Sequence, residues 1–300
     1  MNCLALEQAD GILLVDCGVN FPDDDRGIDV LHPSFRYLEE RADHISGLFL
    51  THGHEDHVGA ISFLLARFKI PVWGPRHALK IAERRVRERF RRYPPLAMDF
   101  RPALPGHVYR VGPFEVEPVR VSHSIVEATA LAIKTAGGTI VHTGDFKFDP
   151  NPPDGEPTDE KRLEQLGDAG VELLLSDSTN VGIPHGASSG APSEAVVADA
   201  LEALIERAPR RVLVGLFSSN VQRLISLGAI AERTGRRIVL LGRSLRGHVE
   251  TAQELGHLRW ESDLRATDAE LATLPPSEVL VLAGGTQAES GSALTRIAGS

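Results

Sequence analysis

The sequence predicts an α/β protein in two parts, which differ in how their strands and helices follow one another. Up to about Thr179, apolar runs of strand length are separated by short turns and a few helical segments. Beyond that residue, near-continuous apolar runs alternate with helical segments, which is the pattern of a buried parallel sheet. A third observation is the run HGHEDH at 52–57, which directly follows a buried strand. We therefore expect one domain over 1–181 that carries a metal site, and a second, parallel-sheet domain over 182–300.

Composition narrows the class of protein. A hydrophobic content of 42% and a charged content of 24% are typical of a soluble globular chain, and no apolar stretch approaches the roughly 18 residues that span a bilayer. The start of the chain has no basic segment of the kind that opens a signal peptide. Cys3 and Cys17 lie in apolar runs and are expected as buried thiols, which fits a reducing cytoplasm.

The net charge of −9 argues against a protein that coats RNA with a basic surface. An enzyme whose positive charge is local and partly supplied by metal ions remains compatible with it.

The first part is expected to contain paired strands, later strands joined by a hairpin at Gly137-Gly138, and two helices. One of the helices carries six arginines, which indicate an ordinary solvated face more than an RNA contact. The predicted strands are 3–6, 11–16, 114–121, 129–135 and 139–143, and the predicted helices are 56–68 and 78–92.

The second part is expected to form a parallel sheet from strands 211–217, 236–242 and 278–285, with helices over 220–234 and 245–255. Ligands of such sheets lie beyond the carboxyl ends of the strands, and helix N-termini there attract phosphate. Capping by Ser219 and Ser244 is the structural interpretation of the serines at these ends. The functional hypothesis is a phosphate or RNA contact through Ser218, Ser219, Asn220, Arg243 and Ser244.

The run at 52–57 has the chemistry of a metal site. His52, His54, Asp56 and His57 are three imidazoles and a carboxylate, which are zinc ligands, and their two close pairs suggest two metals. A cluster of solvated polar residues in a loop is the alternative. His123 and Asp145 also lie at strand ends, so they can complete the site.

In this interpretation Asp145 bridges two zinc ions, and together with a bridging hydroxide it holds them about 3.5–4 Å apart. Asp16, which also ends a strand, is expected to orient a ligand histidine by a hydrogen bond. His142 is expected to point away from the ligands, and the remaining histidines are treated as ordinary.

The order Asp16, HGHEDH, His123, Asp145 resembles the metallo-β-lactamase superfamily of two-metal hydrolases. Further segments are similar to the β-CASP group and to the ribonuclease J family within it. These segments are FPDDDRGID (21–29), HTGDFKFD (142–149), SDSTNV (176–181), LFSSNVQR (216–223), LLGRSL (240–245) and GGTQAES (284–290). The resemblance covers nearly the whole chain.

The resemblance implies a four-layer αββα sandwich with an inserted α/β β-CASP domain. It implies that His52, His54 and His123 bind one metal, Asp56 and His57 the other, and Asp145 both. Asp56, Asp145 and Asp177 would be the catalytic carboxylates, with Asp177 supporting the site. It further implies a zinc ribonuclease, with manganese or magnesium as alternative metals. Such an enzyme cuts RNA internally and also from a 5′ end that carries a monophosphate.

Some features depart from the family pattern. Gln287-Ala288-Glu289-Ser290 replaces the more usual Gln-Gly-Glu-Pro, and the family's later histidine motifs have no counterpart after Asp145. We therefore expect a fragment of a longer protein, truncated at both ends and incomplete in its C-terminal domain. Such a fragment can be inactive by itself, and the full-length protein can form a homo-oligomer.

Three other functions compete with the ribonuclease hypothesis: a non-catalytic subunit of an RNA-decay assembly, a DNA-processing β-CASP nuclease, and a hydrolase of small thioesters or lactams. Comparing the activity of this chain with that of a longer one would test the first alternative.

Overall fold

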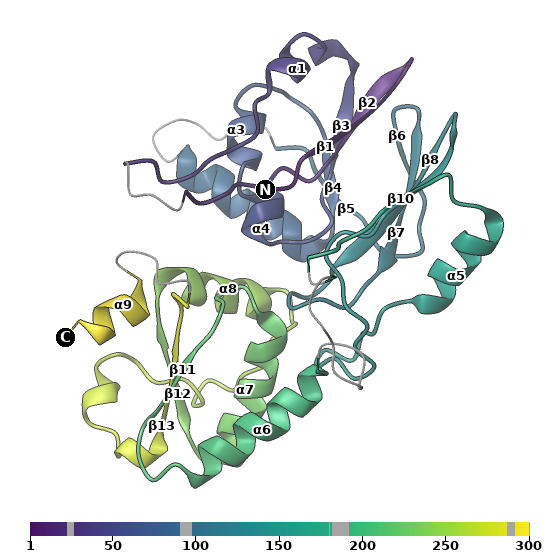
Figure 1. Ribbon diagram of the computed structural model, residues 1–300. Helices are drawn as coiled ribbons and strands as arrows, with labels where there is room; N and C mark the ends of the chain where they lie inside the picture. The colour runs from purple at the N-terminus through teal and green to yellow at the C-terminus, as the bar shows by residue number, and fades with distance from the viewer. Residues whose placement is uncertain (23–26, 91–97, 180, 182–191, 287–291, 300) are drawn as a thin grey trace. The chain divides into compact units, whose positions relative to one another are not determined.

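The computed structural model describes residues 1–22, 27–90, 98–179, 181, 192–286 and 292–299 (Figure 1). The chain divides into two compact units. The first unit comprises Met1–His123, Glu127–Phe148 and Thr158–Ser189, and the second comprises Ser124–Val126, Asp149–Pro157 and Gly190–Ser300. Two short stretches before residue 181 thus belong to the second unit, and a domain boundary at 181 stays a prediction.

The first unit contains two five-stranded sheets. One has the order β1-β2-β3-β4-β5, with β1 antiparallel to β2 and the other neighbours parallel. Its strands are β1 (Leu4–Gln8), β2 (Gly11–Val15), β3 (Ile45–Phe49), β4 (Val72–Gly74) and β5 (Phe100–Pro102). The other has the order β10-β9-β8-β7-β6 and is antiparallel except for the β9–β10 pair. Its strands are β6 (Tyr109–Val111), β7 (Phe114–Arg120), β8 (Thr129–Thr135), β9 (Gly138–His142) and β10 (Leu173–Leu175).

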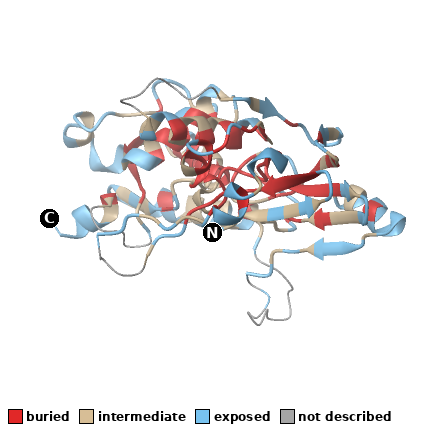
Figure 2. Ribbon diagram, turned by 90° about the horizontal axis from the view of Figure 1, so that it is seen from above, coloured by how far each residue is buried: buried red, intermediate tan, exposed pale blue. Residues whose placement is uncertain are grey.

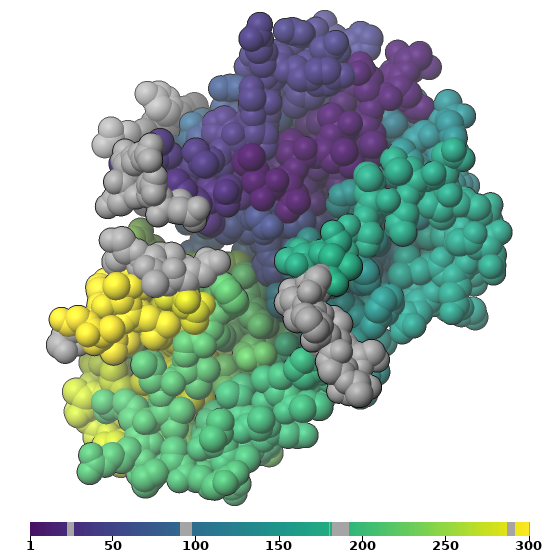
Figure 3. Space-filling view, viewed as in Figure 1, coloured from purple at the N-terminus to yellow at the C-terminus, as the bar shows by residue number. Residues whose placement is uncertain are grey.

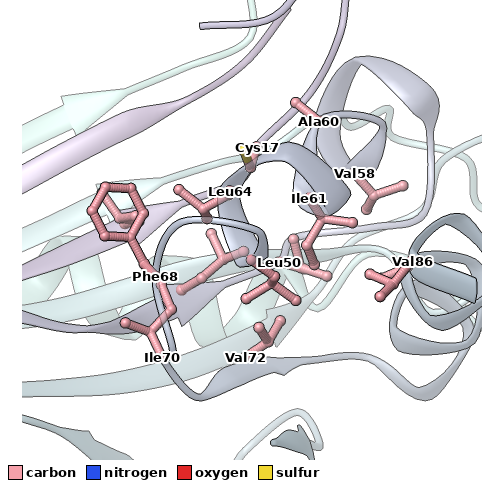
Figure 4. Packing of buried hydrophobic residues seen from close by; sticks show 14 of the residues in the cluster. Cys17, Leu50, Val58, Ala60, Ile61, Leu64, Phe68, Ile70, Val72 and Val86 are labelled. Atoms are coloured by element: carbon pink, nitrogen blue, oxygen red, sulfur yellow. The ribbon is translucent and has the colours of Figure 1, made fainter. Parts of the chain in front are cut away.

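Alternation along β2 shows how the layers form. Leu13 and Val15 pack with Phe114 and Leu131 of the second sheet, so the two sheets meet face to face. Ile12 and Leu14 point the other way, into a core shared with the helices of the first sheet, part of which is drawn in Figure 4. Those helices are α1 (Arg36–Glu39), α2 (Glu55–Val58), α3 (Ile61–Leu65) and α4 (Arg76–Arg89), with a 3-10 turn at Ala42–His44.

The second sheet is covered by α5 (Glu160–Ala169), whose Leu163 and Leu166 pack on Val119 and Val141. The layers of the first unit are therefore helix, sheet, sheet, helix, and the αββα expectation is confirmed (Figure 1). The buried segments of these cores are among those drawn in red in Figure 2.

The predicted helix over 56–68 is wrong as a continuous element. It breaks between α2 and α3, where the extension of β2 competes for its backbone groups. Cys17 N donates to the His57 carbonyl oxygen, and Ala60 N donates to the Cys17 carbonyl oxygen. The break ties the ligand-bearing turn to the end of β2.

The predicted helix over 78–92 begins earlier, at Arg76, and is described to Arg89, with Arg91 and Arg92 outside the described residues. Its arginines form ion pairs with glutamates, Arg84 with Glu88 and Arg87 with Glu83, as an ordinary solvated helix face does. Both cysteines are free thiols; Cys17 is buried and Cys3 is partly buried.

The second unit contains a parallel sheet, as predicted, and its three strands have the order β11-β13-β12. Its strands are β11 (Val212–Gly215), β12 (Arg237–Leu241) and β13 (Val279–Ala283). Its helices are α6 (Glu194–Arg207), α7 (Val221–Arg233), α8 (Arg243–Glu254) and α9 (Ala293–Ala298), with 3-10 turns at Glu270–Ala272 and Pro276–Glu278. Leu224, Leu245 and Leu280 belong to the core that joins sheet and helices.

The predicted serine caps are wrong. Asn220 caps α7, because its side chain accepts a hydrogen bond from Arg223 N. The cap position of α8 is Gly242, whose φ of 119° lies in the region that favours glycine, and Ser244 lies inside the helix. Within the described residues, no helix is long and apolar enough to cross a membrane.

Candidate metal centre

Strand ends of both sheets of the first unit converge on one group of side chains. His52 to His57 follow β3, His123 follows β7, and Asp145 follows β9. In the described part of the chain, two sets of these residues bring their ligand atoms within 4.8 Å of one another. The first set is His52, His54, His123 and Asp145, and the second set is Asp56, His57 and Asp145.

Three imidazoles define the first set. His54 Nδ1 lies 3.1 Å from His52 Nε2 and also 3.1 Å from His123 Nε2. His52 is buried, whereas His54 and His123 are half-buried. The three ring nitrogens therefore face a common point at the edge of the protein interior.

One imidazole and two carboxylates define the second set. His57 Nε2 lies 3.4 Å from Asp56 Oδ2 and 3.3 Å from Asp145 Oδ1. The other oxygen of Asp145, Oδ2, lies 3.8 Å from His123 Nε2. Asp145 thus directs one carboxylate oxygen to each set, as a bridging ligand would.

The charges of the two sets differ. Burial lowers the pKa of His52 and of His54 well below the usual value, and it also lowers the pKa of His123. Burial alone would lower the pKa of His57 as well, but Asp16, with Asp145 and Asp56, outweighs it and raises that pKa to about 12. The three imidazoles of the first set are therefore neutral, whereas the second set holds an imidazolium among carboxylates.

The donor atoms of both sets fit divalent cations. Neutral imidazole nitrogens that converge at 3.1 Å have lone pairs directed at one point, which a cation stabilises. In the second set a cation can replace the proton of His57 between two carboxylates. The nitrogen donors of the first set favour zinc. The oxygen donors of the second set are also good ligands for manganese or magnesium.

Asp16 and Thr51 orient His57 and His52 through hydrogen bonds to Nδ1, the ring nitrogen that faces away from the site. The Asp16 carboxylate is buried and accepts hydrogen bonds from His57 Nδ1, Thr51 N and Thr51 Oγ1, each 2.8 Å long. Because the Thr51 hydroxyl donates to Asp16, its oxygen can accept from His52 Nδ1 at 3.0 Å. Both rings therefore carry a proton on Nδ1 and direct Nε2 into the site.

Two glycines permit this close approach. A β-carbon on Gly18 would lie 1.6 Å from the Asp56 carbonyl oxygen, so only glycine lets the extension of β2 touch α2. Gly144 has a φ of 57°, and a β-carbon there would lie 3.0 Å from the Thr129 carbonyl oxygen. The turn at Gly144 directs Asp145 back toward the histidines.

A cleft of about 650 Å³ opens beside the second set. Asp177 lines it, donates from its backbone N to Thr143 Oγ1, and accepts hydrogen bonds through its carboxylate from Thr179 N and Oγ1. His142 also lines this cleft, with Nδ1 accepting from Gly144 N. Neither residue belongs to the two sets found among the described residues.

Two residues of this site are not predicted from the sequence. Thr51 directly precedes the histidine run, but no residue pattern indicates the role of its hydroxyl. Asn2 lies at the cleft and contacts both Asp56 and His57, although 54 residues separate it from Asp56. No residue pattern around Asn2 indicates a ligand, so only the fold reveals it.

The strand ends of the second unit also meet. Gly284 N donates to the Leu241 carbonyl oxygen, and a β-carbon on Gly284 would lie 2.5 Å from Ser218 Oγ. Ser218, Ser219 and Asn220 are half-buried, whereas Arg243 and Ser244 are exposed. Gln287 to Ser290 lie outside the described residues.

Comparison with known families decides the assignment. Residues 2–215, more than half of the chain, match the model of the metallo-beta-lactamase superfamily. The chain belongs to the metallo-beta-lactamase superfamily. Residues 209–300 match the model of the ribonuclease J beta-CASP domain, so this superfamily member also carries the inserted domain that the sequence predicts.

Curated relatives of this superfamily member bear the name ribonuclease J. One from Mycobacterium tuberculosis (strain CDC 1551 / Oshkosh) is 43% identical over 298 residues, which cover 99% of this chain and 52% of the relative. One from Helicobacter pylori (strain B128) is 38% identical, with 99% of this chain and 42% of the relative covered. The chain spans about half the length of the curated relatives it matches.

A solved structure shares the fold. A protein of unknown function from Enterococcus faecalis V583 superimposes with a TM-score of 0.62 at 16% identity, covering 93% of this chain and 73% of that one.

Proposed function

We propose that the protein hydrolyses phosphodiester bonds of RNA with two divalent cations, held by the two sets that share Asp145. The observation that carries this proposal is the division of the Asp145 carboxylate, with one oxygen toward His57 and the other toward His123. The match of residues 209–300 to the ribonuclease J beta-CASP domain, and the names of the relatives, support RNA as the substrate.

His52, His54, His123 and Asp145 would hold one cation, and Asp56, His57 and Asp145 the other. Zinc suits the first set best, with manganese or magnesium as alternatives in the second. When bound, the cations would supply the Lewis acidity that converts water near neutral pH into the hydroxide required as the nucleophile. We include Asp177 as a third catalytic carboxylate, because it lines the cleft beside the second set.

The residues of the chain prepare this chemistry before any cation arrives. Asp16 keeps the proton of His57 on Nδ1, so that Nε2 faces the cleft. Thr51 does the same for His52. Because the donors are fixed by buried hydrogen bonds, little reorganisation is required when a phosphodiester enters.

We assign RNA and phosphate contacts to Ser218, Ser219, Asn220, Arg243 and Ser244, at the strand ends of the second unit. The proposal includes both internal cleavage and 5′–3′ degradation from a 5′-monophosphate. It also includes a cytoplasmic setting and a homo-oligomer.

The test uses the purified chain, stripped with a chelator and then reloaded with zinc or with manganese. The substrates are one labelled RNA carrying a 5′-monophosphate, the same RNA with a 5′-triphosphate, and the matching single-stranded DNA. We expect cleavage of RNA only after reloading, and faster degradation of the monophosphorylated form.

His54→Ala is expected to abolish the cleavage, whereas His107→Ala, at an exposed histidine, keeps it. Metal binding without cleavage would favour a non-catalytic role, and preferential cleavage of DNA would favour a DNA-processing nuclease. Cleavage that persists in the stripped chain would refute the metal-dependent mechanism.

A further inference from the structure

Asn2 is fixed against the second set by its own backbone. Asn2 N donates to the Asp56 carbonyl oxygen at 2.7 Å, and the Asn2 carbonyl oxygen accepts from Gly18 N at 2.8 Å. These bonds hold Asn2 between the extension of β2 and the start of α2. The start of the chain reaches the surface of the first unit there, in dark purple in Figure 3.

The side chain of Asn2 ends among the ligand atoms. Nδ2 lies 2.9 Å from His57 Nε2 and 3.1 Å from Asp56 Oδ2, and it also donates to the Asp56 carbonyl oxygen at 3.2 Å. His57 Nε2 and Asp56 Oδ2 are themselves 3.4 Å apart. The carboxamide therefore occupies a third corner beside two proposed ligands of one cation.

These separations are those of a coordination sphere. Around an octahedral cation with bonds of about 2.1 Å, neighbouring ligand atoms lie about 3 Å apart. A half-turn of the carboxamide about its Cβ–Cγ bond exchanges Nδ2 for Oδ1 and brings the carbonyl oxygen to this corner. Amide oxygens are good ligands for hard divalent cations.

We propose that the carboxamide oxygen of Asn2 is an additional ligand at the second metal position, an inference that rests on the proposed two-metal function. Without a cation, the amide nitrogen donates hydrogen bonds to the backbone carbonyl oxygen and the carboxylate of Asp56. With a cation, the oxygen faces it. The second position then has three oxygen donors and one nitrogen donor, the reverse of the first.

The test measures manganese binding to the metal-free chain by calorimetry and by the EPR signal of free Mn²⁺. Three variants are compared with the wild type: Asn2→Ala, Asn2→Asp, and the control Asn20→Ala at an exposed asparagine. Thermal unfolding of the metal-free proteins reports whether each variant is folded. Asn2→Asp is isosteric and keeps the backbone bonds, so it decides the question if the alanine variant does not fold.

We expect Asn2→Ala to lower the affinity for the second manganese ion at least tenfold and to leave the affinity for the first ion unchanged. Asn2→Asp should bind the second manganese as tightly as the wild type or more tightly, because a carboxylate can ligate but cannot donate. The Asn20→Ala control should match the wild type.

A loss in Asn2→Asp as large as that in Asn2→Ala would overturn the inference, because the amide would then act only as a donor to Asp56. An unchanged second affinity in Asn2→Ala would overturn it too, as would a single manganese in the saturated wild type. If the wild type bound neither manganese nor zinc, the proposed two-metal function itself would be refuted.

Discussion

Polar residues gather at strand ends in both units, yet the two edges are built differently. In the first unit, side chains from β3, β7 and β9 converge, and Asp16 and Thr51 hold their histidines from behind. In the second unit, the corresponding polar residues serve the helices: Asn220 caps α7, and Arg243 and Ser244 are the first residues of α8. A strand end becomes a reactive centre when buried partners orient the side chains that it carries.

The largest expected effect is at the residue that both metal sets share. Asp145→Ala should remove both cations and lower RNA hydrolysis at least about a thousandfold, because the lost cations contribute several kcal/mol to catalysis. Metal content and initial rates measure this. Asp168→Ala, at an exposed aspartate of α5, is the matched control and should change neither. Full activity in Asp145→Ala would contradict the claim that the strand ends of the first unit, unlike those of the second, form a reactive metal centre.

The next effect concerns the buried support. Asp16→Asn keeps the shape of the side chain but replaces one acceptor oxygen by a donor that faces Thr51 or His57. We expect affinity for the second cation to fall by about 10–100-fold, the usual result of removing such a partner. Competition with a coloured chelator measures the affinity, and Asp43→Asn, on the surface, should behave as the wild type. An unchanged affinity would mean that the hydrogen bond between Asp16 and the ligand histidine does not account for the difference between the strand ends of the two units.

Proton release distinguishes the two metal sets. His57 is protonated at neutral pH because Asp16 and the other carboxylates raise its pKa to about 12, so the second cation must displace a proton. Its affinity should therefore rise about tenfold per pH unit. The first cation should release none, because burial lowers the pKa of His52 and of His54. Calorimetry in two buffers of different ionisation enthalpy counts the protons, and equal release at both steps would contradict this difference.

The smallest effect is expected at the edge of the second unit. Arg243→Ala removes one exposed cation, so RNA affinity should fall a few-fold and the salt dependence should lose about 0.7 of a unit in slope. Binding titrations of single-stranded RNA at several salt concentrations measure both. Arg259→Ala, beyond the opposite end of α8, should leave them unchanged, and equal losses in the two variants would speak against a specific contact.

The ligand types of the metal centre could be predicted because they are concentrated in one run at a strand end. The residues from His52 to His57 include three imidazoles and a carboxylate within six positions. His123 and Asp145 follow apolar runs of strand length. Asn2 could not be predicted, since its role depends on backbone bonds to Asp56 and Gly18 that form only in the fold.

Two local predictions differ from the structure, each for a physical reason. Helical spacing over 56–68 is real, but the backbone of Cys17 takes hydrogen bonds that a continuous helix would need. Serine is a common cap, yet Gly242 holds the cap position of α8 with a positive φ that serine adopts only at a cost. In the first case a neighbouring element overrode the local preference, and in the second case the positive φ of the backbone did.

The most direct measurement is the metal content of the purified chain, determined by mass spectrometry beside His54→Ala and Asp145→Ala. We predict about two equivalents in the wild type, about one or fewer in His54→Ala, and close to none in Asp145→Ala. A folded wild-type chain that retains no metal after reloading, or variants that retain the wild-type content, would contradict the central claim that the strand ends of the first unit form a two-metal centre.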